Sequence, residues 1–494
     1  MRVGFDNKKY LELQKKKITE RIKKFNNKLY IEFGGKLFDD HHAARVLPGF
    51  DRNVKIDVLK LFKDKIEVLF VISAKDIEEG KIRSDLGIAY ENDILRQMDK
   101  LKKLNILADK IVITQFENEP AARLFKNKME KRNIKVFFHT YTKGYPTDID
   151  TIVSKDGYGA NPYIKTDMPI VLVTAPGPGS GKLATCLSQI YHEFENGITA
   201  GYAKYETFPV WNLPLKHPIN LAYEAATADL SDVNMIDSFH LEKYGETTVN
   251  YNRDLAVFPI LKTILTKIYG KNIYNSPTDM GVNMVGYAIT DDKIVMEASR
   301  SEIIRRYYNE LCESKKGKSN ERAIKKLELL MSEEGINSKD RIVIKEALNK
   351  FKKKKKISIA IKLQNDKIIT GRNTDIMTAS ASVVLNSIKY LSGVKDNVHL
   401  ISPVILEPII TLKKQLFDNG DTLLNLHDIL MALSISRATN PIVDEALHKL
   451  SELSSCDAHA SHIITNDDVK TFKSLGVFLT QEPDFYSSNL YDEK

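Results

Sequence analysis

The chain has 494 residues, of which 43% are hydrophobic and 28% are charged, so it can bury more than one core. This composition excludes a disordered, collagenous or disulfide-scaffold protein. No run approaches the roughly 20 apolar residues of a membrane helix, and the first residues lack an apolar signal core. Because the three cysteines also lie far apart, we expect a multidomain cytoplasmic protein without a membrane partner.

The formal net charge is +8, and its excess is local. Residues 315–356 contain 15 Lys and Arg against 6 Asp and Glu, which leaves the rest of the chain nearly neutral. Aromatic side chains are not interleaved with these residues, and Phe351 is the only aromatic neighbour of the run Lys352–Lys356. This pattern favours a solvated helical face over a phosphate-backbone site, and we expect no nucleic-acid partner.

The first part of the chain alternates between predicted strands and helices. A basic amphipathic helix over residues 8–28 is followed by a strand over 29–35 that ends in a glycine turn. Three further strands are predicted over 66–73, 110–114 and 134–139, with helices over 92–107 and 120–132. Apolar strands separated by amphipathic helices indicate βαβ crossovers and a parallel sheet covered on both faces.

A loop over residues 144–167 leads into a second βα unit, with a strand over 169–174, a glycine-rich turn and a helix over 182–195. Helices dominate from residue 255 to about 356, and another α/β pattern begins near 357 and includes a strand over 458–464. We therefore predict an α/β protein with three regions. These are an N-terminal region with a Rossmann- or P-loop-like parallel sheet (1–254), a mostly helical segment (255–356) and a smaller C-terminal α/β domain (357–494).

The glycine-rich turn is the most informative motif. It lies between a predicted strand and a predicted helix, where unpaired N–H groups and a partial positive charge favour phosphate. Gly177, Gly179 and Gly181 allow the backbone to curl around an anion, and Lys182 adds an ammonium group. The alternative is a tight βα turn that needs glycine only for close packing.

The match to the nucleotide-binding pattern G-x-x-x-x-G-K-[ST] is incomplete. Pro176 occupies the first glycine position, and Leu183 replaces the hydroxyl residue that binds Mg²⁺. Ser180 and Thr185 carry hydroxyls at different offsets, and we predict that they contact the bound phosphate or a metal. We therefore expect a nucleotide or phosphorylated metabolite to bind with little dependence on Mg²⁺.

Two other clusters contain candidate catalytic residues. Asp40, His41, His42 and Arg45 follow the first strand, where they suit acid–base work and an anionic substrate. Helix capping by the aspartate is the alternative for that cluster. The second cluster contains Asp237 and His240, for which substrate lining and turn formation both remain open.

A third cluster, Cys456, His459 and His462, has a spacing that suits three zinc ligands. No fourth ligand stands nearby, and polar residues entering a strand are the alternative. We therefore assign no metal to it.

Long motifs in this chain resemble a bacterial family of unknown function. They are residues 33–50, 174–185 and 276–283, together with a tail over 380–483 that includes Ile401–Pro408 and Thr439–Pro441. Members of that family are sometimes labelled ATP-dependent zinc proteases. This chain lacks the zinc-protease pattern H-E-x-x-H, because His192 and Glu193 are followed by Asn196 at the second ligand position. The resemblance implies the fold and leaves the reaction open.

These observations predict an enzyme, a transferase or hydrolase, that acts on a phosphorylated or nucleotide-like small molecule. The turn would hold the phosphate, and the two clusters around His41 and Asp237 would move protons or position the substrate. A non-catalytic regulator that binds a nucleotide or metabolite in the same anion pocket is the alternative. The sequence leaves a homo-oligomer open.

Overall fold

A computed structural model describes residues 3–487 except for 84–85, 231, 319 and 417–421. The chain forms two compact units. One comprises Arg2–Glu224 and Asp232–Ala298, and the other comprises Ala225–Ser231 and Ser299–Lys494. The helices predicted between residues 255 and 356 are present, and they are divided between the two units.

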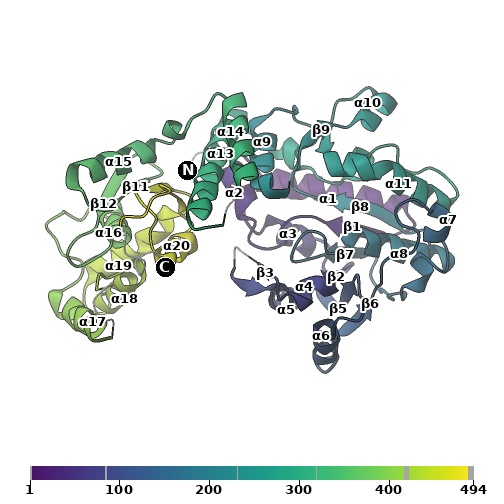
Figure 1. The fold of residues 1–494 in the computed structure, drawn as a ribbon, viewed down its shortest axis with the longest axis horizontal. Coiled ribbons are helices and arrows are strands. Elements are labelled where there is room, and N and C mark those ends of the chain that lie inside the picture. Colours follow the sequence, from purple (N-terminus) through teal and green to yellow (C-terminus); the bar gives the residue numbers. More distant parts are fainter. Residues whose placement is uncertain (1–2, 84–85, 231, 319, 417–421, 488–494) are drawn as a thin grey trace. The chain divides into compact units, whose positions relative to one another are not determined.

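The first unit is built on a six-stranded parallel sheet (Figure 1). Its strand order is β6-β5-β2-β7-β1-β8. The strands are β1 (Leu29–Phe33), β2 (Ile66–Ser73), β5 (Leu107–Thr114), β6 (Lys135–Phe138), β7 (Ile170–Thr174) and β8 (Gly201–Tyr205). All residues of β2 and β7 are buried, as continuous apolar runs require in a sheet covered on both faces. The predicted parallel α/β sheet is confirmed.

Helices and two short hairpins complete this unit. The hairpins are β3 (Ile82–Arg83) with β4 (Ile88–Ala89), and β9 (Asn234–Ile236) with β10 (Val249–Tyr251). The helices are α1 (Asn7–Lys24), α2 (His41–Val46), α3 (Val54–Lys60), α4 (Ala74–Glu78), α5 (Tyr90–Lys103), α6 (Pro120–Glu130), α7 (Ile149–Ile152), α8 (Lys182–Glu195), α9 (Pro218–Ala226, whose last residues belong to the second unit), α10 (Ser238–Tyr244), α11 (Asn252–Tyr269) and α12 (Pro277–Met280). The loop predicted over 144–167 contains α7 and one turn of 3₁₀-helix.

The helices that follow β1 and β7 cover opposite faces of the sheet. Successive side chains of a strand point to opposite faces. The ammonium of Lys55, on α3, lies 5.3 Å from the centre of the Phe33 ring on one face. On the other face, the hydroxyl of Tyr30 donates a hydrogen bond of 2.8 Å to Glu193 of α8.

This topology creates a switch point between two neighbouring strands. The chain leaving β1 passes β7 to reach β2, whereas the chain leaving β7 passes β1 to reach β8. Because these connections run over opposite faces of the sheet, they separate above the carboxyl ends of β7 and β1. Open α/β sheets bind their ligands in the crevice that such a divergence leaves.

The second unit contains a smaller mixed sheet with the order β12-β11-β13-β14. Its strands are β11 (Ser358–Lys362), β12 (Ile368–Arg372), β13 (Asp457–Ala460) and β14 (Phe478–Gln481). Only β13 and β14 are parallel to each other. The predicted smaller C-terminal α/β fold is confirmed, whereas β12 and β14 had not been predicted.

Helices cover both faces of this sheet. The helices of this unit are α13 (Asp292–Lys315, which begins in the first unit), α14 (Glu321–Glu333), α15 (Ile342–Lys354), α16 (Ala379–Leu391), α17 (Pro403–Leu416), α18 (Leu426–Ser436), α19 (Pro441–His448) and α20 (Asn466–Ser474). Ile359 and Ile361 of β11 pack in the core with α16, whereas Ala360 between them packs against α15. None of the helices formed by the described residues has both the length and the apolar character needed to cross a membrane.

Candidate functional site

The glycine-rich turn lies at the switch point, after β7 and before α8. Gly179 and Gly181 have φ values of +73° and +82°, which L side chains rarely adopt, and Gly181 is the N-cap of α8. Gly177 packs against the ring of Tyr90, where an added Cβ would lie 2.4 Å from the hydroxyl oxygen. Two different requirements for glycine, conformation and space, therefore apply within one turn.

The backbone of this turn presents a row of donors. Within the described part of the chain, the amides of residues 179–184 donate no hydrogen bond, and the first bond of the helix is donated by Thr185 to the carbonyl of Gly181 at 3.0 Å. Lys182 is half-buried, and no carboxylate among the described residues pairs with it. Unpaired amides and an ammonium at a helix N-terminus are the groups that hold phosphate in glycine-rich loops.

The two hydroxyls of the turn have internal partners. Ser180 donates to the carbonyl of Gly177 and Thr185 to that of Gly181, each at 3.0 Å. Both side chains are buried, and Thr114 at the end of β5 donates to the carbonyl of Ser180 at 2.7 Å. In this arrangement Ser180 and Thr185 shape the turn. Their predicted role as direct ligand contacts stays a prediction.

Asp40 lies in the loop after β1, and it has structural partners. It caps α2 through the amide of Ala43 at 3.1 Å, and it pairs with the buried ammonium of Lys55 at 2.7 Å. Burial alone would raise the pKa of Asp40, but Lys55 and the cap hold that pKa below its ordinary value. Asp40 is therefore an ionised anchor of this loop.

The two histidines that follow have different surroundings. Burial and the neighbouring cations Arg52, Arg45 and Lys36 lower the pKa of His41 to about 4, so its ring is neutral at pH 7. The ring of His42 packs edge-on against Phe208, with 5.1 Å between centroids. The structure thus places His41 near Arg45 and two other cations, and His42 against an aromatic ring.

A carboxylate cluster at the end of β8 was not predicted from the sequence. Glu206 follows β8, and its Oε2 lies 3.2 Å from the ammonium of Lys204, which also binds Asp254 of α11 at 2.5 Å. Burial, opposed by Lys204 and supported by Asp254 and Glu32, raises the pKa of Glu206 to about 7. Its side chain is 26% exposed, so solvent reaches a carboxyl group whose pKa lies near neutral pH.

Gly34, the first residue after β1, makes room for this carboxylate. A Cβ on Gly34 would lie 2.2 Å from Cγ of Glu206 and 2.3 Å from its Oε1. The signal available in the sequence was the pair Gly34-Gly35 directly after a strand, but it does not reveal which side chain fills the space. Glu206 therefore lies over the end of β1.

The carboxylate cluster and the glycine-rich turn belong to the same edge of the sheet. Glu32 of β1 accepts a hydrogen bond of 2.6 Å from Tyr202 of β8, and it acts on the pKa of Glu206. Burial, and then Glu32, raise the pKa of Cys186 on α8 well above its ordinary value, while Lys182 opposes them. One polar layer beneath α8 thus contains groups from the turn, β1 and β8.

Asp237 and His240 lie in another cluster, on the β9–β10 hairpin. Asp237 is fully buried, caps α10 through the amide of His240 at 3.0 Å, and accepts a hydrogen bond of 2.7 Å from the Thr278 hydroxyl. A ring nitrogen of His240 lies 2.8 Å from the hydroxyl of Ser276. These bonds join the 276–283 motif to the hairpin, and in the described residues none of them reaches the glycine-rich turn. Their catalytic role stays a prediction.

The three candidate zinc ligands have separate partners. His459 lies between the Thr480 hydroxyl at 2.9 Å and Glu482 at 3.1 Å, whereas Nδ1 of His462 lies 3.0 Å from the hydroxyl of Ser461. The described residues contain no group of three or more His, Cys, Asp or Glu side chains arranged to hold a metal ion.

Comparison with known proteins identifies the class to which this fold and sequence belong. The profile of the domain of unknown function DUF1846, N-terminal, matches residues 3–335, and that of DUF1846, C-terminal, matches residues 339–491. The chain belongs to the DUF1846 family, which confirms the resemblance to a family of unknown function.

Three relatives match essentially the whole chain. A UPF0371 protein of Clostridium botulinum (strain Alaska E43 / Type E3) is 53% identical over 500 residues, which cover 99% of both chains. A UPF0371 protein of Clostridioides difficile (strain 630) is 53% identical, covering 99% of this chain and all of the relative. A UPF0371 protein of Clostridium tetani (strain Massachusetts / E88) is 52% identical, covering 99% of both chains. These names state no activity, so the function is argued from the site.

Proposed function

We propose that this protein is an enzyme that binds a phosphorylated small molecule at the switch point between β7 and β1. The phosphate binds to the amides of residues 179–184 and to Lys182, and Glu206 transfers a proton to or from the bound substrate. The observation that carries the proposal is the row of unpaired amides beside an unpaired lysine at the carboxyl edge of a parallel sheet.

The placement of Glu206 supports catalysis in addition to binding. A general acid or base works best when its pKa lies near the working pH, and the pKa of Glu206 is raised to about 7. The carboxylate lies over the end of β1, the neighbour of β7, so a substrate anchored by its phosphate at the turn extends toward it. The reaction class that fits is a transfer or hydrolysis at a phosphorylated substrate.

The three cations near His41 support an anionic substrate. Arg52, Arg45 and Lys36 all lower the pKa of His41, in a segment after β1 that also contains three aspartates. Because the turn lacks the hydroxyl that binds Mg²⁺ in nucleotide-binding loops, protein cations take over the neutralisation of phosphate charge. We therefore expect binding without added Mg²⁺.

A non-catalytic phosphate-binding regulator is the second candidate. It is favoured by the ion pairs of Lys204, since an ammonium that binds both Glu206 and Asp254 also serves as the centre of a structural ion cluster. Only the enzyme requires that Glu206 be needed for turnover while it is dispensable for binding.

A thermal-shift screen tests the shared part of both functions. Inorganic phosphate, sugar phosphates and nucleotides are added to the full chain with and without Mg²⁺, because a ligand that binds the folded state stabilises it by mass action. Lys182→Ala removes one charge-assisted contact of about 1.5–3 kcal/mol, so the affinity of the best ligand should fall roughly tenfold to a hundredfold. Lys128→Ala, at an exposed lysine of α6, is the matched control.

Glu206→Gln then separates the two candidates. For an enzyme, this variant retains the affinity of the best ligand and loses turnover of that ligand, measured as release of inorganic phosphate or of a transferred group. Unchanged turnover in Glu206→Gln contradicts the role of this residue. Unchanged affinity in Lys182→Ala contradicts the binding site itself.

A further inference from the structure

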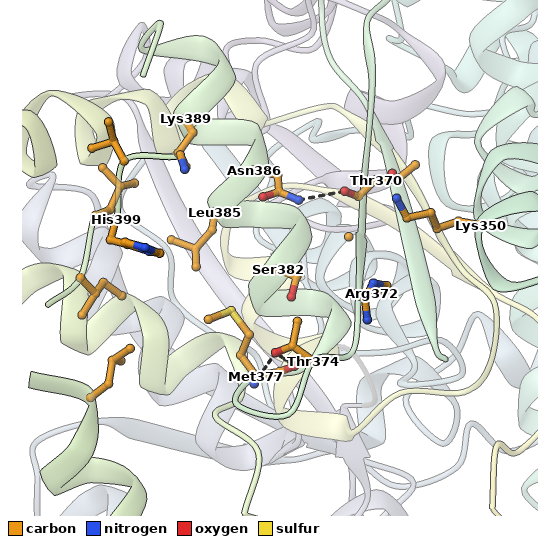
Figure 2. A pocket seen from close by; sticks show the side chains of 15 residues that line it. Lys350, Thr370, Arg372, Thr374, Met377, Ser382, Leu385, Asn386, Lys389 and His399 are labelled. Atoms are coloured by element: carbon orange, nitrogen blue, oxygen red, sulfur yellow. Dashed lines mark hydrogen bonds between the residues drawn. The ribbon is translucent and has the colours of Figure 1, made fainter. Parts of the chain in front are cut away.

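The second unit contains a cavity of about 340 Å³ of its own, between β12, α16 and the segment before α17 (Figure 2). Ser382, Leu385, Asn386 and Lys389 contribute to it from one face of α16, since their spacing of three and four residues places them on a single helical stripe. Its size lies within the range of small-molecule sites.

The charges that line this cavity have one sign. Lys350, Arg372 and Lys389 lie around it, together with His399. Within the described part of the chain, no Asp or Glu lines it. Asp375, which lies close in sequence, forms an ion pair with Lys356 at 3.0 Å, and Lys356 and then Arg372 lower its pKa.

The polar side chains of the cavity differ in whether they have a partner. The amide of Asn386 donates to the carbonyl of Thr370 at 2.9 Å, and the hydroxyl of Thr374 has backbone partners in its own turn. By contrast, Ser382 is 7% exposed, and its buried hydroxyl has no hydrogen-bond partner among the described residues. A buried hydroxyl without a partner is costly, and a ligand acceptor in the cavity would satisfy it.

The remaining lining is apolar. Leu385, Leu400 and Leu406 contribute to it, and Leu400 is almost fully buried. The wall between β12 and α16 is tightly packed, because a Cβ on Gly371 would lie 2.3 Å from the backbone nitrogen of Val383. A ligand thus meets cations and an unpaired hydroxyl on one side and an apolar surface on another.

We propose that this cavity binds a small organic anion with two or more negative charges and an apolar body, that is, a phosphomonoester or a dicarboxylate. Arg372 and Lys350 pair with the charged group, Ser382 donates to it, and the leucines contact the apolar body. This site is independent of the one proposed at the glycine-rich turn.

Isothermal titration calorimetry of the full chain tests the proposal. The titrations use the Lys182→Ala variant, in which binding at the first site is expected to be weakened. The probes are phenyl phosphate and phthalate, with inorganic phosphate and phenol as controls that lack the apolar body or the charge. We expect saturable binding of at least one aromatic dianion, with both controls binding at least tenfold more weakly. The tighter of the two dianions identifies the charged group.

Arg372→Gln and Lys350→Gln, each added to that variant, should weaken binding roughly tenfold or more, because each removes a charge-assisted contact. Lys395→Gln, at an exposed lysine that does not line the cavity, should leave it unchanged. Hydrogen exchange should show protection of β12 and of residues 398–401 by the bound probe. The proposal is overturned by no saturation with either dianion up to millimolar concentration, by full affinity in both Gln variants, or by protection confined to other segments.

Discussion

Gly34→Ala tests how the end of β1 is fitted to Glu206. The methyl carbon would lie 2.3 Å from Oε1 of Glu206, and ordinary contacts begin near 3.4 Å, so the carboxylate has to retreat by about 1 Å. The φ of Gly34 is not in the left-handed region, so the backbone itself tolerates alanine. The whole effect therefore comes from overpacking, which costs about 1–3 kcal/mol of unfolding free energy.

The assay is denaturant unfolding of four proteins: the wild type, Gly34→Ala, Glu206→Ala and the double variant. Glu206→Ala removes the atoms that the new methyl group meets, so Gly34→Ala should cost less than about 0.5 kcal/mol in that background. Gly281→Ala is the matched control, because its Cβ would have its nearest neighbour at 3.3 Å and its φ is −68°. Equal costs of Gly34→Ala in both backgrounds would refute the proposed contact between Gly34 and Glu206.

Three further outcomes are expected. The pKa of Glu206 is raised in the folded state, so the folded protein binds more protons than the unfolded chain between pH 4.5 and about 7. The free energy of unfolding should therefore fall as the pH rises through that window. Glu206→Gln should flatten this slope, as measured by urea titrations at several pH values. The pKa of His41 is lowered, so NMR titration of its ring should give a midpoint near 4 and below 5.5, and a midpoint at 6.5 would contradict the cationic surroundings. Asp237→Ala should lower the free energy of unfolding by about 3 kcal/mol, because it leaves the amide of His240 and the hydroxyl of Thr278 without their acceptor. A decrease below about 0.5 kcal/mol would argue against an anchoring role of Asp237.

Local sequence patterns were sufficient for the parallel sheet. The helix predicted to begin at Lys182 begins there, because Gly181 ends the turn with a conformation that the next residues do not share. The strands β2 and β7 were also predictable from local sequence, because an unbroken apolar run between polar segments is typical of a strand in a sheet that helices cover on both faces. The glycine-rich turn was found by the same local signals.

The parts that depend on distant contacts were not predictable. Glu206 looked like an ordinary polar residue after a strand, and only the pairing of β8 with β1 brings it to Gly34. Asp40 resembled a catalytic acid because the sequence does not reveal that the tertiary fold pairs it with Lys55. The strands β12 and β14 are short edge strands with partly exposed residues, so they lack the apolar run by which β2 was recognised.

The most direct test of the central claim is an amide NMR titration of the deuterated full chain with inorganic phosphate and with the best ligand of the thermal screen. Binding at the turn should shift the amides of Gly179, Gly181 and Lys182 along one saturating curve, since these donors face the anion. The amides of Gly197 and Gly245, which lie in open turns with similar backbone angles, should stay in place. Saturable shifts at the turn alone support the phosphate site, whereas the absence of shifts there at saturating ligand would contradict it.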